Sequence, residues 1–137
     1  MKEITPEALN ELCRNTMVSH QGIQILTYED GLLTASMPVD ERNIQPMGFL
    51  HGGASLALAE TVASIGSAAM TNTDEYHVFG VQVSGNHLNT ARSGSVFAQA
   101  VLIHHGRSSH VWNIDITAEN GKLISTARVS IAIVKKK

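Results

Sequence analysis

The sequence predicts an α+β fold in which an antiparallel β-sheet wraps around one long central helix. Two observations predict this fold: one long, alanine-rich segment with a single charge, and six extended runs in which apolar and polar residues tend to alternate. Such a helix must lie on one face of the sheet. With 137 residues, of which 43% are apolar, the chain can bury its own core, and we expect one domain over residues 1–137.

The N-terminal part of the chain is expected to form a helix and a hairpin. A short helix is predicted from Thr5 to about Thr16, because Thr5 can cap its first turn. Two extended runs follow between residues 21 and 39, and the turn sequence at 29–31 is typical of an antiparallel hairpin. A loop over residues 40–49 then leads to the central helix.

The segment from Leu50 to about Met70 is predicted to be the central helix. It is long enough for about five turns, and Glu60 is its only charged residue. Its side chains leave little polar face, so we expect the helix to be buried nearly all round. Four further strands are expected after it, over residues 77–88, 95–105, 108–118 and 122–134.

Charge and cysteine content restrict the function. Charged residues make up 16% of the chain, below the ~25% of typical soluble domains, so we expect part of the surface to be covered by self-association. The net charge of −2 offers no basic surface for nucleic acid. The single cysteine, Cys13, excludes an intrachain disulfide and suits a reducing compartment. The chain shows no leader pattern and no apolar run of ~18 residues, and we expect a cytoplasmic protein without a membrane partner.

Glu60 is the first candidate for a catalytic residue. A buried, unpaired carboxylate costs roughly several kcal/mol, so an accidental glutamate in this helix would be strongly disfavoured. The alternatives are an ion pair with Arg92 or Arg107, or a helix that is half exposed. Ser64, one turn further along the same face, could hold the carboxylate or an attacking water, or could simply bond back to a helix carbonyl.

The start of the central helix is the second candidate site. Gly52 and Gly53 follow His51, and glycine lets a ligand approach the free N–H groups of a first helical turn. These groups can stabilise negative charge on a carbonyl oxygen, with the Gln45 amide as a second donor. Alternatively, the glycines only form a tight turn and Gln45 is solvated.

The spacing of the two candidate groups predicts a shared site. Gly52 and Glu60 are eight residues apart, which is about 12 Å along a helix. One Glu60 side chain cannot bridge that distance to a carbonyl held at its own helix N-terminus. If both groups serve one reaction, they must come from two chains with antiparallel helices, so we expect a homodimer with shared active sites.

The run NIQPMGFLHGGASLALAETVAS, which contains Gln45, His51-Gly52-Gly53 and Glu60, resembles the hotdog-fold acyl-CoA thioesterases. Within them it resembles the branch of 1,4-dihydroxy-2-naphthoyl-CoA hydrolases and enterobactin-pathway proofreading thioesterases. The likeness includes TPEALN, SMPVDERNIQP, GNHLNTARSG and GRSSHVWNIDI. It implies a hotdog fold, hydrolysis of an acyl-CoA with an aromatic acyl group, such as 1,4-dihydroxy-2-naphthoyl-CoA of menaquinone biosynthesis, and a homodimer that pairs into a homotetramer.

The resemblance also implies roles for single residues. Glu60 looks like the carboxylate that attacks the thioester carbonyl or activates water. The Gly52 N–H and the Gln45 amide look like the donors that polarise this carbonyl. His51 looks like the residue that orders the loop, and Ser64 like the hydroxyl beside the attacking group.

Coenzyme A is expected as part of the substrate, so no separate cofactor is predicted. The resemblance places Asn86, His87 and Asn89 along the pantetheine, and Gly106, Arg107, Ser108 and Ser109 at the nucleotide end, where Arg107 can bind phosphate oxygens. We expect His105 beside this second group. No metal is expected, because His104 and His105 point to opposite faces of a strand and no cysteine or acidic pair completes a site.

Two other functions remain open. A hotdog enoyl-CoA hydratase or dehydratase would use a histidine paired with an acid for proton transfer. A non-catalytic acyl-CoA-binding module would bind the same ligand without releasing thiol. Candidates for the lining of the acyl channel are Met17, Phe49, Val62 and Met70.

Overall fold

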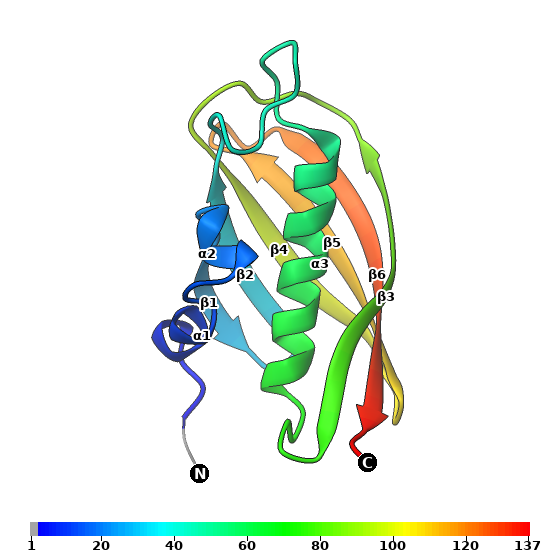
Figure 1. Cartoon of the computed structure of the whole chain (residues 1–137). Helices are drawn as coiled ribbons and strands as arrows, with labels where there is room; N and C mark the ends of the chain where they lie inside the picture. The colour runs from blue at the N-terminus through cyan, green and yellow to red at the C-terminus, as the bar shows by residue number, and fades with distance from the viewer. Residues whose placement is uncertain (1–2) are drawn as a thin grey trace.

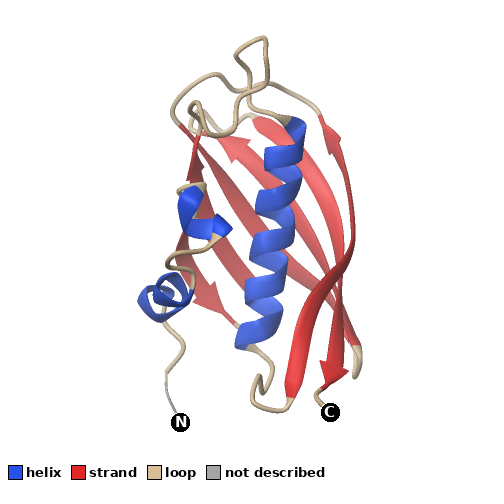
Figure 2. Cartoon of the chain, in the orientation of Figure 1, coloured by secondary structure: helices blue, strands red, loops and turns tan. Residues whose placement is uncertain are grey.

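The computed structural model describes residues 3–137, which form a six-stranded antiparallel sheet curled around a long helix (Figure 1). The strand order is β1-β2-β4-β5-β6-β3. Two short helices lie beside the long helix, over one edge of the sheet (Figure 2). The elements are α1 (Pro6–Leu12), α2 (Met17–His20), β1 (Gln24–Glu29), β2 (Leu32–Pro38), α3 (Gly52–Ala69), β3 (Tyr76–His87), β4 (Ser95–His105), β5 (Ser109–Ala118) and β6 (Leu123–Lys135). The predicted α+β hotdog fold is confirmed.

The N-terminal helix is shorter than predicted. Instead of one helix from Thr5 to about Thr16, the chain forms α1 and α2, separated by a turn in which Asn15 has a φ of 60°. Thr16 accepts a hydrogen bond from the Val18 N–H and so begins a new helix rather than ending the first one. Thr5 caps α1, as predicted.

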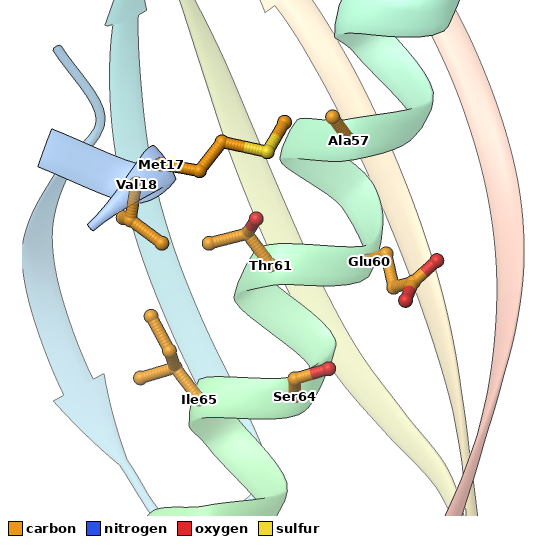
Figure 3. Close-up of a pocket in the computed structure, with 7 residues that line it drawn as sticks. All are labelled: Met17, Val18, Ala57, Glu60, Thr61, Ser64 and Ile65. Atoms are coloured by element: carbon orange, nitrogen blue, oxygen red, sulfur yellow. The ribbon is translucent and has the colours of Figure 1, made fainter. Parts of the chain in front are cut away.

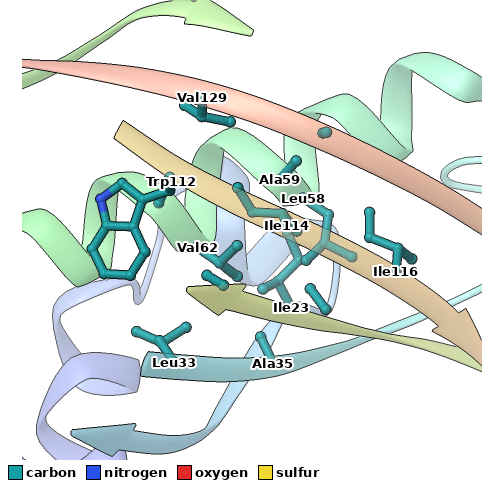
Figure 4. Close-up of a cluster of buried hydrophobic side chains, with 14 of the residues drawn as sticks. Ile23, Leu33, Ala35, Leu58, Ala59, Val62, Trp112, Ile114, Ile116 and Val129 are labelled. Atoms are coloured by element: carbon teal, nitrogen blue, oxygen red, sulfur yellow. The ribbon is translucent and has the colours of Figure 1, made fainter. Parts of the chain in front are cut away.

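The prediction that α3 is buried nearly all round is wrong for the single chain. One sheet can cover only one side of a helix, and the side of α3 away from it, including Glu60 and Ser64, is partly exposed. The covered side packs into the main apolar core (Figure 4). The buried residues on this side of α3 are Ser55, Leu58, Ala59, Val62, Ala63, Gly66 and Ser67.

The C-terminal half of α3 packs closely on β5. A Cβ atom on Gly66 would lie 2.6 Å from Cη2 of Trp112, which is completely buried. The Trp112 Nε1–H donates to Ser67 Oγ at 2.8 Å, and Nδ1 of the buried His110 is 2.7 Å from the same oxygen. Burial, followed by the nearby charges of His105 and His104, holds the pKa of His110 below its ordinary value of 6.5.

The two edges of the sheet differ. The β1 edge is capped at one residue by the Asn10 side chain, which donates to the Ile25 carbonyl at 3.0 Å and accepts from the Ile25 N–H at 2.8 Å. The β3 edge pairs only with β6, so no strand of residues 3–137 covers its other side. Phe79 and Val81 on this strand are exposed. A long, open, partly apolar edge of this kind favours pairing with another chain.

Gly66→Ala is expected to destabilise the fold. Alanine gains ~1 kcal/mol over glycine in a helix, but overpacking against the Trp112 ring costs about 1–3 kcal/mol. We expect a net loss of up to about 2 kcal/mol in the free energy of unfolding, measured by urea denaturation. In a double-mutant cycle with Trp112→Phe, the smaller ring should reduce this loss. If the losses in the free energy of unfolding of the two single variants simply add in the double variant, the Trp112 ring does not restrict the size of the residue at position 66.

The low pKa of His110 predicts a pH dependence of stability. Below pH 6.5 the unfolded chain binds a proton at His110 that the folded chain resists, so the free energy of unfolding should fall as the pH is lowered through this range. His110→Gln can still bond to Ser67 but does not titrate. Urea denaturation between pH 7 and 5 should therefore show a shallower fall for the variant. Parallel curves would contradict the prediction.

Candidate active site

Glu60 projects from the partly exposed side of α3 toward β3. Its carboxylate rests against the backbone at Gly80, where a Cβ atom would lie 2.5 Å from Oε2. The two ion pairs among residues 3–137 are Arg14–Glu11 and Arg42–Asp40, so neither proposed arginine partner holds Glu60. Of the two structural alternatives, the single chain therefore shows the half-exposed helix and not the ion pair.

A pocket of about 330 Å³ lies beside Glu60 (Figure 3). Glu60 and Ser64 project from α3 on one side, one turn apart, whereas Thr61 and Ile65 point toward α2. Glu60 is the only ionisable side chain among the lining residues Met17, Val18, Ala57, Glu60, Thr61, Ser64 and Ile65. The site therefore combines one carboxylate with a mostly apolar wall.

A second pocket, of about 450 Å³, shares Val18 and Ile65 with the first and has no charged residue in its lining. Met17, a predicted lining residue of the acyl channel, lines the first of the two pockets. Val62 does not, because it lies on the sheet-facing side of α3 and is completely buried. Met70 packs against the core, and Phe49 lines a third pocket at the N-terminal end of α3.

The N-terminal end of α3 leaves one backbone donor free. His51 is the N-cap, and its Nδ1 accepts the Gly53 N–H at 2.7 Å. Nδ1 is thus an acceptor, which places the proton of the neutral ring on Nε2. The Gly52 N–H donates to no acceptor within residues 3–137. The cap therefore satisfies Gly53 and leaves Gly52 available for a ligand oxygen.

Gln45 is held so that its amide nitrogen is also available. Its Oε1 accepts the Met47 N–H at 2.6 Å and the Phe49 N–H at 3.4 Å. The backbone of the loop adds a bond from the Gln45 N–H to the Phe49 carbonyl, at 2.7 Å. Because the oxygen is fixed within the loop, the donor end of the side chain, Nε2, remains for a ligand.

His87 lies directly against this helix N-terminus. Its Nδ1 is 2.7 Å from Oγ of the buried Ser125, and a Cβ atom on Gly52 would lie 2.7 Å from its Nε2. Gln45, Gly52, His87 and Asn89 line one pocket of about 250 Å³, together with Ser125. The structure thus brings four of the predicted site residues together.

Asn86 does not join this group. Successive residues of a strand point to opposite faces, so Asn86 lines a separate pocket with Asn113 and Arg128, on the face of the sheet away from α3. Asn89 does line the pocket at Gly52, but its Nδ2 already donates to the Leu123 carbonyl at 2.8 Å.

The other predicted coenzyme A residues, His105 to Ser109, lie at the opposite end of the molecule. This turn is near the C-terminal end of α3 (Figure 1). The rings of His105 and His110 meet edge to face, with their centroids 4.7 Å apart. Within the turn, the Gly106 N–H donates to the Ser109 carbonyl at 2.8 Å, while the Ser108 carbonyl accepts the Ile133 N–H of β6 at 2.9 Å. Arg107 is exposed. Within one chain, the two predicted coenzyme A segments are therefore not adjacent.

Sequence reasoning missed two residues next to the candidate groups, Ser125 and Gly80. Ser125 faces inward on β6 among apolar neighbours, and a polar residue at an inward position was a signal that could have been found. Gly80 carried no comparable signal. Residues 3–137 hold no cluster of histidine, cysteine or acidic side chains suited to a metal, and none of their helices is long and apolar enough to cross a membrane.

Comparisons with known proteins agree with this geometry. The family model described as "Thioesterase superfamily" matches residues 47–125. A 1,4-dihydroxy-2-naphthoyl-CoA hydrolase of Listeria monocytogenes is 45% identical over 85% of this chain and 94% of its own length. The proofreading thioesterase EntH of Klebsiella pneumoniae is 42% identical over 97% of this chain and 96% of its own length. The crystal structure of a mutant thioesterase from Pseudomonas aeruginosa superimposes with a TM-score of 0.94 at 41% identity, covering 98% of this chain and 97% of that one. The chain therefore belongs to the thioesterase superfamily, as a thioester hydrolase with the hotdog fold.

Proposed function

We propose that this hydrolase cleaves an acyl-CoA thioester to a free acid and coenzyme A, and that the acyl group is aromatic or otherwise bulky. The observation that carries the proposal is Glu60, the single carboxylate in an apolar pocket on α3. A thioesterase needs such a group near the reacting carbon and hydrogen-bond donors at the carbonyl oxygen. Both kinds of group are present on this chain.

In the proposed reaction, the Gly52 N–H and Gln45 Nε2 bind the thioester carbonyl oxygen. They stabilise the negative charge that develops there when the carbonyl carbon is attacked. Glu60 either attacks this carbon itself or removes a proton from an attacking water, with Ser64 beside it. The C–S bond then breaks, the thiol of coenzyme A leaves with a proton, and the acid is released after one water has been consumed. His51 keeps the Gly52 N–H free by capping its neighbour.

We further propose that each site is shared by two chains. Gly52 and Glu60 belong to the same helix, about 12 Å apart along its axis. The Glu60 carboxylate faces β3, which is the open edge of the sheet. A second chain with an antiparallel helix at this edge would bring its own Gly52 and Gln45 toward Glu60. The same arrangement would place the Arg107 turn of one chain at the end where its partner holds His87. Pairing of dimers into a homotetramer remains a prediction.

The placement of coenzyme A follows from this arrangement. Pantetheine is proposed to pass His87 and Asn89, and the phosphates to meet Arg107, Ser108 and Ser109 near His105 and Gly106 of the other chain. Arg107 is exposed and free to pair with phosphate oxygens. Asn86 is left out of the proposed contacts because it faces the other side of the sheet.

The preference for a bulky acyl group is supported by the pockets. The pocket at Glu60 and its uncharged neighbour, about 330 and 450 Å³, share a wall at Val18 and Ile65. Volumes of this size are typical of small-molecule sites. One relative acts, by its name, on 1,4-dihydroxy-2-naphthoyl-CoA. That acyl group, and with it a role in menaquinone biosynthesis and a cytoplasmic location, remains a prediction for this chain.

The geometry favours hydrolysis over the two alternatives. A hydratase would need a histidine paired with its acid, but Glu60 has no hydrogen bond to a histidine among residues 3–137. A binding module would not need free donors and a carboxylate at a thioester. Incubation with an enoyl-CoA separates the first alternative, because hydration releases no thiol.

Loss of either candidate group should reduce thiol release. Removing one carbonyl donor typically costs ~10²–10³ in turnover, so Gln45→Ala should lose about that factor and Glu60→Ala more. The assay should cover aroyl-, phenylacetyl-, 1,4-dihydroxy-2-naphthoyl- and straight-chain acyl-CoAs. Glu41→Ala and Gln99→Ala, both at exposed positions, are matched controls. Near-full hydrolysis of every active substrate by Glu60→Ala would refute the mechanism.

Mixed dimers should test the shared site. We expect a heterodimer of one Glu60→Ala chain and one Gln45→Ala chain to regain about half of the wild-type turnover. In the shared arrangement, one of its two sites combines the intact Glu60 of one chain with the intact Gln45 of the other. Differently tagged, co-purified chains allow this measurement. Turnover equal to the mean of the two parent variants would show that each site lies within one chain.

A further inference from the structure

Gly80 is the residue on β3 against which the Glu60 carboxylate rests. A Cβ atom built there would lie 2.5 Å from Oε2 and 2.9 Å from both Cδ and Cγ of Glu60. Real Cβ atoms essentially never approach another heavy atom this closely. The present position of the carboxylate therefore requires a residue without a side chain at position 80.

The backbone keeps this position turned toward α3. Gly80 pairs with Ile131, which faces the core and is completely buried. The register shifts directly afterwards, between Gly80 and Gln82, so Val81 is an extra residue and lies exposed. A bulge of this kind redirects the strand locally. Gly80 is thus the last inward position before the bulge, opposite Glu60.

The three heavy atoms nearest to a Cβ atom at position 80 all belong to the flexible side chain of Glu60. By contrast, a Cβ atom on Gly85 of the same strand would meet the Thr126 backbone carbonyl at 3.1 Å and Leu56 at 3.0 Å. We therefore expect rotation of the Glu60 side chain to relieve the closest contacts of a methyl group at position 80. In that case the packing of the fold is retained and the carboxylate moves.

We propose that Gly80 is a positioning residue, whose missing side chain sets where the Glu60 carboxylate stands relative to the thioester carbon. This inference rests on the proposed function, in which Glu60 attacks or activates water. A displacement of about 1 Å in a reacting group can cost ~10²-fold in rate. Gly80 lines neither the pocket at Glu60 nor the one at Gly52. Its effect should therefore fall on kcat and leave KM nearly unchanged.

The test is Gly80→Ala in the full chain, with the best acyl-CoA of the panel. We expect kcat to fall by about 10- to 100-fold, KM to stay within about twofold and the urea midpoint of unfolding to remain at the wild-type value. Glu60→Asp shortens the side chain by one methylene and withdraws it from position 80. Gly80→Ala should therefore cost much less in the Glu60→Asp background than in the wild type.

Each result decides the proposal. The proposal is overturned if Gly80→Ala leaves kcat unchanged, or if it lowers kcat by the same factor in the wild-type and the Glu60→Asp backgrounds. An unfolded variant or a lowered urea midpoint also overturns it, because the strand itself would then need the glycine. Ser84→Ala, at an exposed position of β3 away from Glu60, is the control, and it should leave kcat and the urea midpoint unchanged. If Glu60→Ala hydrolyses as well as the wild type, the proposed function fails first, and that outcome is distinct.

Discussion

The close approach of α3 to the sheet is the constraint on which the rest of the structure depends. Helix and strand can come this near only where one of them lacks bulk, as at Gly66 beneath the Trp112 ring and at Gly52 against His87. The same close approach brings the helix N-terminus and the Glu60 carboxylate onto β3. Packing and the candidate chemistry therefore have one geometric cause, and they cannot vary independently.

Most of the fold follows from local patterns in the sequence. Alternation of apolar residues predicted the four C-terminal strands to within one residue, and the unusual composition of residues 50–70 predicted α3. The composition of α3 did not predict its burial correctly, because an uncharged helix face has the same residues whether a sheet of its own chain or another chain covers it. The break between α1 and α2 was also not predicted, because the four-residue helix that begins after the Thr16 cap is too short to show a periodic pattern.

The candidate site was predictable where a residue type is out of place. Glu60 in an apolar helix, and glycines where that helix begins, are visible without a structure. Ser125 next to His87 and Gly80 next to Glu60 depend on contacts between residues far apart in the chain, and one sequence does not reveal the register of β3 on β6. The predicted coenzyme A residues are separated for the same reason. Strand alternation turns Asn86 to the other face of the sheet, and the turn between β4 and β5, which contains Arg107, lies at the opposite end of the molecule.

The Asn10 side chain has a consequence for growth of the assembly. By occupying both backbone groups of Ile25, it imitates a neighbouring strand and ends the β-sheet ladder at β1. A further strand is thus hindered from pairing at Ile25, whereas the outer side of β3 offers no such obstacle within residues 3–137. In the proposed two-fold dimer, the β1 strands would form both outer edges of the joined sheet, and each would carry this Asn10 cap at Ile25. A single side-chain amide would thus disfavour the addition of further strands at either outer edge.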